Sequence, residues 1–485
     1  MLNASLLSLL IFSPVIFSAI ILVFFNKNSK ISFALGVLST LFSLLLSLYA
    51  TVNYDASSNA MAFVVSHDWW LEGIRYQLGV DGLSLGLILL TAAILPLCIL
   101  SIKKVDKQLP IYIALLLALQ TTIFGVFSAT DLVLFYLFFE ASLIPMYLII
   151  GKWGGKGRIA ASFKFFLYTL VGSLLMLVAI VYLYNIVGST AFSDLRDFNF
   201  DLSVQKYLWL ALFAAFAVKI PMFPFHTWLP VAHVEAPTAG SVILAAILLK
   251  MGAYGFLRLS IPMFPDASAY YADFVMILSA IAVIYASIVA FAQSDIKRLI
   301  AYSSIAHMGY VTIAIFTLTE GGLQAAIYQM ISHGFVSAGL FFCIGVLYDR
   351  YHTRDMAFYG GLAKVMPSFA IIFMIFTMAN VGLPGTSGFV GEFLTIMNVM
   401  PVSGLFTAII AFAVILSAAY GLMLYKNTLL GETNMDKFGS AIDISNREKL
   451  ILVPLILLTL YFGFETTSLT NFTQSAVDII LDTAR

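Results

Sequence analysis

Six ionisable side chains lie inside long apolar stretches of the sequence. An ionised side chain at the centre of a bilayer costs about 3 kcal/mol or more, so residues of this kind usually serve a function. Carboxyl, amino and imidazole groups can all take up and release protons, and a row of them at one depth would let protons hop through a membrane. We therefore predict a proton relay made of Glu140, Lys219, Lys250, His307, His333 and Glu392.

Each of these residues also has a structural interpretation. Glu140, Lys219 and Lys250 could be satisfied by neighbouring hydroxyl groups, although ionisable groups within membranes are mostly functional. A single histidine, such as His307 in SSIAHMGY or His333 in MISHGF, can equally bridge two helices through hydrogen bonds. The sequence therefore supports a relay through the number and placement of these residues, and not through any one of them.

The composition indicates what kind of elements must position these side chains. The chain is 61% hydrophobic and 10% charged, with a mean hydropathy of +0.99, whereas about a quarter of the residues in soluble domains are charged. A helix needs about 20 apolar residues to cross a bilayer, and the alternation typical of membrane barrels is absent. We predict an all-α polytopic membrane protein with about fourteen transmembrane helices at 4–25, 31–52, 83–101, 110–128, 131–150, 160–187, 206–232, 238–259, 272–292, 299–317, 322–348, 366–400, 403–425 and 449–464.

Lysine and arginine residues are concentrated in every second predicted loop, on one side of the membrane. Seventeen lie in loops on one side, three lie within spans, and five lie on the other side. Because cytoplasmic loops carry the excess of positive charge, both termini are predicted to lie on the outer, non-cytoplasmic side. The five residues on the outer side are Arg75, Arg196, Lys206, Arg258 and Arg485.

Two of the predicted spans are interrupted. The seventh is broken at Pro221 and Pro224, and the twelfth is broken around Pro384 within NVGLPGTSGFVGE. Each is the fourth helix of a block of five consecutive helices. Because five is an odd number, the second block starts on the opposite side of the membrane and would run through it inverted. Paired broken helices in inverted repeats point to a transport site, although prolines also simply kink membrane helices. We predict N-terminal helices in 1–109, a first repeat in 110–259, a second repeat in 272–425, and an inner loop with a last helix in 426–485.

Several kinds of chemistry are not expected from this sequence. Cys98 and Cys343 both lie in apolar runs and form no C-x-x-C motif, so metal and iron–sulfur sites are not expected. Nucleotide-binding and nucleophile motifs are absent, as is a soluble domain for a flavin. Lys+Arg and Asp+Glu both number 25, which gives no indication of a nucleic-acid partner. We therefore expect no cofactor and no redox step in this chain.

Five segments resemble the antiporter-like membrane chains of respiratory complex I, the NADH-quinone oxidoreductase. The likeness covers nearly the whole chain, and Glu392 favours the M-type branch, because the L and N types usually carry lysine there. One departure is Val231, where the family usually has an aspartate. The segments are FYLFFEASLIPMYLIIGKWGG, KIPMFPFHTWLPVAHVEAPTAGSVILAAILLKMGAYG, DIKRLIAYSSIAHMGY, MISHGFVSAGLFF and GLPGTSGFVGEF.

The resemblance implies a proton-translocating subunit in a bacterial inner membrane, driven by redox chemistry in other subunits. It implies partners among the membrane subunits of the complex, including neighbouring antiporter-like chains, and NADH, FMN, iron–sulfur clusters and quinone in partner subunits. By motif, Glu140 would pair with Lys219, Lys250 would be the central lysine, His307 and His333 would link the lysines onward, and Glu392 would face the exit.

Three other interpretations fit the same residues. One is the D-type subunit of a multi-subunit sodium/proton antiporter, which shares the lysine and glutamate pattern. Another is a membrane subunit of a related hydrogenase or photosynthetic complex I, which would differ in its electron donor. The third is a passive assembly scaffold, in which substitutions at Glu140 or Lys219 would lower assembly and leave pumping by each assembled complex unchanged.

Overall fold

The described chain is mostly helical. The computed structural model describes residues 2–69, 71–102, 108–432, 438 and 442–484. One small antiparallel sheet pairs β1 (Ala62–Asp68) with β2 (Arg75–Val80). The chain divides into two compact units, the first formed by Met1–Ile220, Ile247–Ala272 and Leu469–Arg485, and the second by Pro221–Ala246 and Asp273–Ser468.

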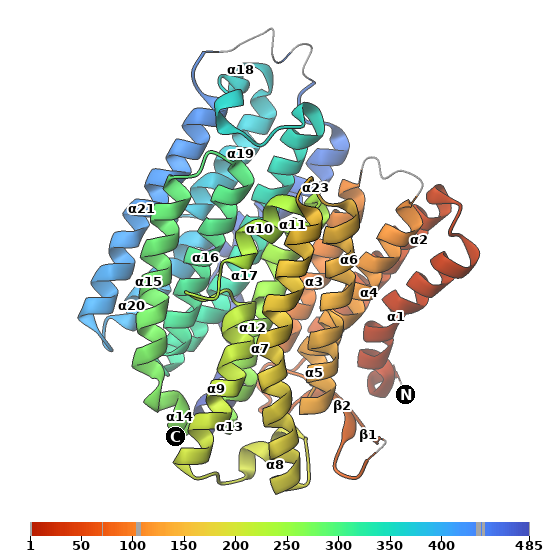
Figure 1. Cartoon of the computed structure of the whole chain (residues 1–485), viewed down its shortest axis with the longest axis vertical. Coiled ribbons are helices and arrows are strands. Elements are labelled where there is room, and N and C mark those ends of the chain that lie inside the picture. The colour runs from red at the N-terminus through yellow and green to blue at the C-terminus, as the bar shows by residue number, and fades with distance from the viewer. Residues whose placement is uncertain (1, 70, 103–107, 433–437, 439–441, 485) are drawn as a thin grey trace. The chain divides into compact units, whose positions relative to one another are not determined.

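The first unit is a helical bundle with the small sheet at one end. Within it, α1 packs on α2 and α4, while α7 packs on α6 and α9 (Figure 1). Its elements include α1 (Leu2–Phe24), α2 (Ser29–Val52), α3 (Gly82–Ser101), α4 (Leu109–Ser128), α5 (Leu132–Ala141), α6 (Leu143–Trp153), α7 (Arg158–Val187), α8 (Phe192–Asp197), α9 (Leu202–Lys219), α12 (Leu249–Gly255), α13 (Ile261–Met263), α14 (Pro265–Tyr270) and α24 (Thr467–Ala484).

The second unit is organised around one long buried helix. This helix, α17 (Glu320–Tyr351), packs against α16, α19, α20 and α23. The other elements are α10 (Trp228–Glu235), α11 (Thr238–Ile243), α15 (Ala272–Phe291), α16 (Ile296–Ile315), η3 (Met356–Phe358), α18 (Leu362–Val365), α19 (Pro367–Asn380), α20 (Ser387–Val399), α21 (Gly404–Leu429) and α23 (Asn446–Phe464).

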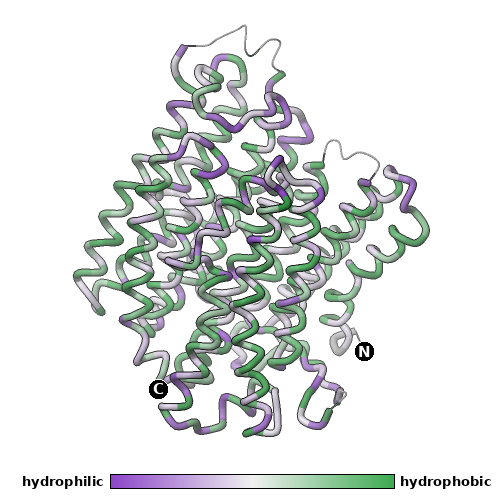
Figure 2. The backbone as a smooth tube through the Cα atoms, viewed as in Figure 1, coloured by the Kyte–Doolittle hydropathy of each residue, from purple (hydrophilic) through white to green (hydrophobic). Residues whose placement is uncertain are grey.

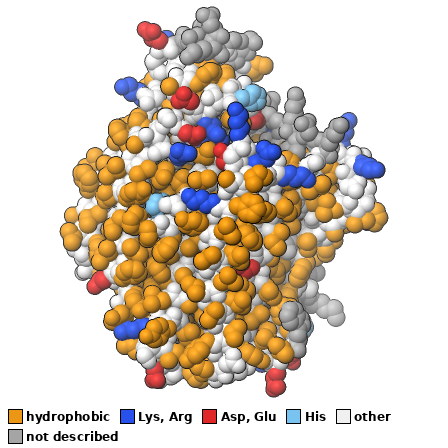
Figure 3. All heavy atoms as spheres, viewed as in Figure 1, with side chains coloured by type: hydrophobic (Ala, Val, Ile, Leu, Met, Phe, Trp, Pro, Cys, Tyr) orange, Lys and Arg blue, Asp and Glu red, His pale blue; other side chains and the backbone are white. Residues whose placement is uncertain are grey.

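The helices carry the apolar surface that a bilayer requires. Hydrophobic residues run along them and hydrophilic residues concentrate at their ends and in loops (Figure 2). Hydrophobic side chains also cover most of the face shown in Figure 3. In the described part of the chain, eleven helices are long and apolar enough to cross a membrane, or twelve if the bent pair Asn446–Phe464 and Thr467–Asp482 forms one span. The prediction of an all-α polytopic membrane protein is confirmed.

The predicted count of fourteen spans is not reached by this measure. Three predicted spans fall outside the eleven: α16, the broken span formed by the short helices α19 and α20, and α23, which counts only as part of the bent pair. The sequence of α16 contains Lys297, Arg298 and His307, which lower its hydropathy. The count of fourteen, the two inverted repeats and their boundaries stay predictions.

Both predicted breaks are present in the chain. The residues between Lys219, the end of α9, and Trp228, the start of α10, form no regular helix. Pro221 follows there and has no N–H to continue the helical ladder. The second break separates α19 from α20, and Gly382 within it has a φ of 75°, which favours glycine. Backbone groups freed at such breaks can serve a transport site.

Local signals in the sequence explain where several helices begin. Asp81, Asp131 and Asp295 each accept hydrogen bonds from backbone N–H groups in the first turn of the helix that follows. Such caps satisfy donors that have no partner within the helix. These three carboxylates fix the starts of α3, α5 and α16, and so the register of the side chains that follow.

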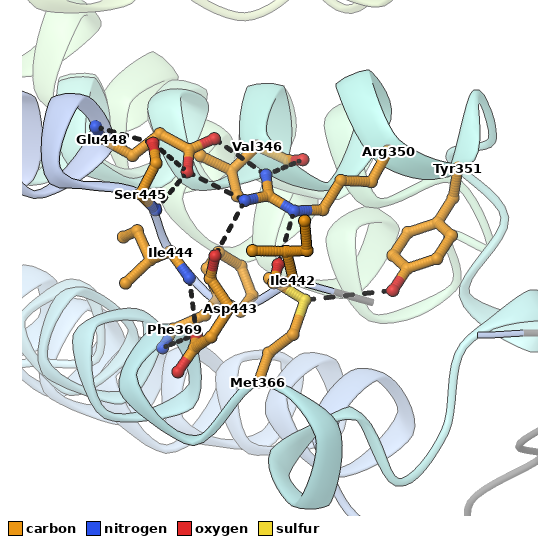
Figure 4. A network of polar contacts seen from close by, with 10 residues as sticks. All are labelled: Val346, Arg350, Tyr351, Met366, Phe369, Ile442, Asp443, Ile444, Ser445 and Glu448. Carbon is orange, nitrogen blue, oxygen red and sulfur yellow. Dashed lines mark hydrogen bonds and ion pairs between the residues drawn. The ribbon is translucent and has the colours of Figure 1, made fainter. Parts of the chain in front are cut away.

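A polar network fixes the segment that precedes α23. Arg350, near the end of α17, binds both carboxylate oxygens of Glu448 at 2.8 Å and donates to the carbonyls of Ile442 and Asp443 (Figure 4). The Asp443 carboxylate accepts from Ser368 N at 2.9 Å, at the start of α19. Bidentate arginine–carboxylate pairs are among the stronger polar contacts. This network therefore ties α17, α19 and α23 together.

Some of the charges used to predict orientation cannot be placed. Lys103, Lys104, Lys107, Lys437 and Arg485 lie outside the described residues. The orientation of the two termini therefore stays a prediction.

The assignment of Arg258 to an outer loop is wrong. It lies in a π-helical segment, Phe256–Ser260, within the buried span Thr238–Met263, and its side chain is 6% exposed.

Candidate functional site

Lys219 occupies the end of a broken helix. It is the last residue of α9 and is only 1% exposed. Its Nζ donates to Ser142 Oγ at 3.4 Å and lies 4.7 Å from the centroid of the Phe139 ring. The last carbonyl groups of a helix lack donors within the helix and carry partial negative charge. The end of α9 therefore favours a cation at this position.

Glu140 lies on α5, two residues before the hydroxyl that binds Lys219. It is partly buried and interacts electrostatically with Lys219, and the Ser173 hydroxyl also acts on it. Its helix begins after Asp131, whose carboxylate accepts from Val133 N at 2.9 Å. The ammonium and the carboxylate thus act on each other without a contact ion pair among the described residues of this site.

Lys250 lies in the middle of a fully buried span. It is 0% exposed, and its helix, α12, is flanked by the π-helical segments Leu244–Leu248 and Phe256–Ser260. Such insertions are rare and are often found at functional sites. At Gly252, an added Cβ would lie 2.8 Å from the Phe216 carbonyl oxygen, so α12 and α9 pack closely. Within the first unit, Lys250 is therefore carried by a helix that packs against the one ending in Lys219.

A buried ion pair in the same unit was missed by the sequence analysis. Arg258 Nη2 lies 2.7 and 2.6 Å from the two carboxylate oxygens of Asp81, and it also donates to Ser84 Oγ at 3.2 Å. Asp81 caps α3 at the same time, and the Arg258 guanidinium lies 5.4 Å from the centroid of the Tyr254 ring. The alternation of charge by loops placed Arg258 outside, and no signal in the sequence links it with Asp81.

In the second unit the structure brings three of the predicted residues together. His307 Nδ1 lies 3.0 Å from Glu392 Oε1, and the rings of His307 and His333 lie 5.5 Å apart. All three side chains are at least 95% buried. The break before α20 makes room for the carboxylate, because a Cβ at Gly382 would lie 2.8 Å from Glu392 Oε2. His307 Nδ1 and Glu392 Oε1 thus lie within ion-pair distance, while Glu392 Oε1 makes no hydrogen bond in this structure.

Two amide side chains complete the surroundings of His307. Its Nε2 lies 3.1 Å from Asn380 Oδ1, and its Nδ1 lies 3.4 Å from Gln329 Nε2. Asn380 is the last residue of α19, and Gln329 lies one turn before His333 on α17. Neither amide was singled out from the sequence, because an amide within an apolar helix is most simply a bridge between helices.

Cys98 and Cys343 are both buried, as expected for core residues. Within the described ranges, no group of three or more His, Cys, Asp or Glu side chains is arranged to hold a metal ion.

The six predicted residues thus fall into two groups. Glu140, Lys219 and Lys250 belong to the first unit, and His307, His333 and Glu392 belong to the second. The first group contains an ammonium held by a hydroxyl, and the second contains a histidine in contact with a carboxylate. Both arrangements are chemically able to exchange protons.

Comparison with known proteins identifies closely similar sequences. Residues 129–417 match the family described as NADH:quinone oxidoreductase/Mrp antiporter, TM. NADH-quinone oxidoreductase subunit M of Rhodobacter capsulatus is 49% identical over 493 residues, which cover 98% of this chain and 96% of that protein.

Solved structures agree with this relationship. A chain in the structure of respiratory complex I from Thermus thermophilus with bound NADH superposes with a TM-score of 0.90 at 32% identity, covering 99% of both chains. A chain of the Mrp complex from Dietzia sp. DQ12-45-1b has a TM-score of 0.87 at 19% identity, covering 99% of this chain and 98% of that one. The second likeness shows a shared fold alone.

Proposed function

Since the chain belongs to the subunit M group of the NADH:quinone oxidoreductase/Mrp antiporter family, we propose that its buried ionisable residues carry protons across the membrane. The chain is a multi-pass membrane subunit of the NADH-quinone oxidoreductase complex, in which redox chemistry drives proton pumping. The relay consists of Glu140, Lys219, Lys250, His307, His333 and Glu392.

The observation that carries this proposal is the placement of Lys219. Its ammonium is almost completely buried at the end of α9, is held by a single hydroxyl, and acts on Glu140 without direct contact. Burial disfavours an ammonium ion and a nearby carboxylate favours it. Displacement of Glu140 toward or away from Lys219 therefore changes how tightly the lysine holds its proton.

The energy involved is within reach of such a displacement. Moving one proton against a potential of about 180 mV requires about 4 kcal/mol. Burial combined with one charged partner can change the proton affinity of a lysine by a comparable amount. The redox module of the complex would supply the energy by moving the charges that surround Glu140 and Lys219.

The second unit would complete the transfer. His307 and Glu392 are close enough to share a proton, and His333 lies next to His307. We place the residues in the order Glu140 and Lys219, Lys250, His307 and His333, and finally Glu392, with uptake from the cytoplasm and release to the periplasm. The repeats at 110–259 and 272–425 would supply one half of this path each.

The surroundings of the chain follow from the same proposal. Its partners would be the other membrane subunits of the complex, including neighbouring antiporter-like chains, within a bacterial inner membrane and with both termini in the periplasm. NADH, FMN, iron–sulfur clusters and quinone would be bound by partner subunits.

Proton pumping in inverted membrane vesicles tests the proposal. The Lys219→Ala and Glu140→Gln variants should lose about tenfold or more of the NADH-driven proton uptake per assembled complex. Lys164→Ala is the matched control, since this lysine is partly exposed and lies 5.7 Å from the centroid of the Tyr168 ring. Wild-type pumping in both relay variants would contradict the proposal. Lower assembly with unchanged pumping per complex would instead indicate a scaffold.

A further inference from the structure

Among the described residues, the ring of His307 has three polar neighbours, each on a different helix. Glu392 Oε1 lies 3.0 Å from Nδ1, Gln329 Nε2 lies 3.4 Å from Nδ1, and Asn380 Oδ1 lies 3.1 Å from Nε2. These neighbours come from α20, α17 and α19. Gln329 is 1% exposed and Asn380 is 7% exposed, so water does not readily replace either amide. Two groups therefore compete for one ring nitrogen.

The chemistry of the amides determines where the protons lie. The Asn380 amide oxygen can only accept, so Nε2 of His307 carries a hydrogen and donates it. The Gln329 amide nitrogen can only donate, so it binds Nδ1 when that nitrogen carries no hydrogen. Glu392 Oε1 lies 3.0 Å from the same nitrogen but makes no hydrogen bond in this structure, and a hydrogen bond between them would require a proton on Nδ1 or on the carboxyl group.

We propose that Gln329 is a positioning residue that takes over Nδ1 of His307 when the proton shared with Glu392 departs. This inference rests on the proposed relay. In the loaded state, the proton lies between Nδ1 and Oε1, and His307 and Glu392 hold each other. On release, the N–H or O–H bond breaks, the proton passes to water, and a carboxylate and a bare Nδ1 remain. The Gln329 N–H then donates to Nδ1 and stabilises this emptied state.

The backbone allows the amide to reach this position. At Gly391, an added Cβ would lie 2.0 Å from Gln329 Oε1 and 3.0 Å from Gln329 Cα, so glycine lets α20 pack closely against α17 and the amide lie beside Glu392. The other titratable groups around the pair are His333 on α17, Tyr310 on α16 and Tyr420 on α21, and both tyrosines act electrostatically on Glu392. Among the described neighbours of Nδ1, only the Gln329 amide supplies a fixed neutral donor.

The pH profile of proton pumping by the intact complex tests this inference. Gln329→Leu removes the donor, so the emptied state loses its hydrogen bond and the pair holds its proton more tightly. Because release then requires a lower proton concentration, the acidic limb of the profile should move to higher pH by about 0.5 to 1 unit. Gln329→Glu should move it in the same direction and further, because a carboxylate beside Nδ1 favours the protonated ring. Gln324→Leu is the matched control, as another buried glutamine on α17.

The outcomes separate this inference from the relay itself. Pumping is measured per assembled complex, so a loss of folding alone changes the amount of complex and leaves the midpoint of the profile in place. If Glu392→Gln abolishes pumping and Gln329→Leu keeps the wild-type midpoint, the role of Gln329 is refuted and the relay stands. If Glu392→Gln pumps normally, the relay itself fails. A shift in Gln324→Leu equal to that in Gln329→Leu would also refute the specific role of Gln329.

Discussion

Lys219 and Arg258 are two buried cations of the same unit that are held in opposite ways. Arg258 contacts both oxygens of Asp81 at 2.7 and 2.6 Å, whereas Lys219 reaches a serine hydroxyl at 3.4 Å and acts on Glu140 from a distance. An arginine cannot be deprotonated in proteins, whereas a buried lysine changes its protonation readily. The comparison indicates that a tightly paired cation fixes the structure and a loosely paired one is free to exchange a proton.

The pair of His307 and Glu392 in the second unit combines the two patterns. Its distance of 3.0 Å is that of a tight pair, but histidine can lose its proton at neutral pH. Contact distance alone therefore does not separate a structural pair from a functional one. The ability of both partners to change their charge is also required.

The largest effect on stability is expected at the fixed pair. Asp81→Asn leaves the Arg258 guanidinium buried without a counter-charge, which should cost about 3 to 5 kcal/mol and reduce the assembly of the chain. Native gels and thermal unfolding of the purified complex would measure this loss. Asp197→Asn is the control, because its pair with Arg196 is solvent-exposed and contributes little. Normal assembly of Asp81→Asn would contradict the structural role of the ion pair between Asp81 and Arg258.

The same chemical change at Glu392 should have the opposite result. Glu392→Gln removes a proton-binding group but keeps an oxygen that can accept from His307, so assembly should stay near the wild-type level. NADH-driven proton pumping should fall about tenfold or more, because the amide cannot take up and release the proton. If Glu392→Gln assembles poorly but pumps normally per complex, the pair of His307 and Glu392 is structural, like that of Asp81 and Arg258, and does not carry protons.

The smallest effect is expected in the loop before α23. Partial burial raises the pKa of Asp443, but N–H donors from Ile444, Ser368 and Phe369 outweigh it and hold the pKa below its usual value. Asp443 therefore stabilises the folded state above about pH 4, and this contribution is lost as the pH falls through the lower folded pKa. Asp443→Asn should cost about 1 kcal/mol or less at pH 7, since the carboxylate is partly exposed.

Thermal unfolding at several pH values would check this prediction. The difference between Asp443→Asn and the wild type should be present at pH 7 and shrink below about pH 4. An equal difference at both pH values would show that the carboxylate contributes no charge-dependent stability.

Much of the fold could be predicted from the sequence, because a bilayer restricts the backbone conformations that can span it. Apolar length predicted the helices, and Pro221 and Pro384 mark breaks that the structure contains. Asp131, which directly precedes an apolar run, caps the helix formed by that run. These features depend on neighbouring residues along the chain, and local sequence is sufficient to predict them.

Contacts between segments far apart in the chain could not be predicted from the sequence. The pairing of Arg258 with Asp81 joins residues 177 positions apart, and no periodicity links them. The amides of Gln329 and Asn380 were also missed, because their importance comes from the ring that they touch. The sequence predicted which groups could carry protons, while the structure shows which of them are held tightly.

The most direct test of the account is the Lys219→Arg variant, which keeps the positive charge but cannot release a proton at any physiological pH. NADH-driven proton uptake per assembled complex would be measured in inverted vesicles, with Lys164→Arg as the control. We expect near-normal assembly and a loss of pumping as large as that in Lys219→Ala. Wild-type pumping by Lys219→Arg would show that only the charge at this position matters, and would contradict proton release by Lys219.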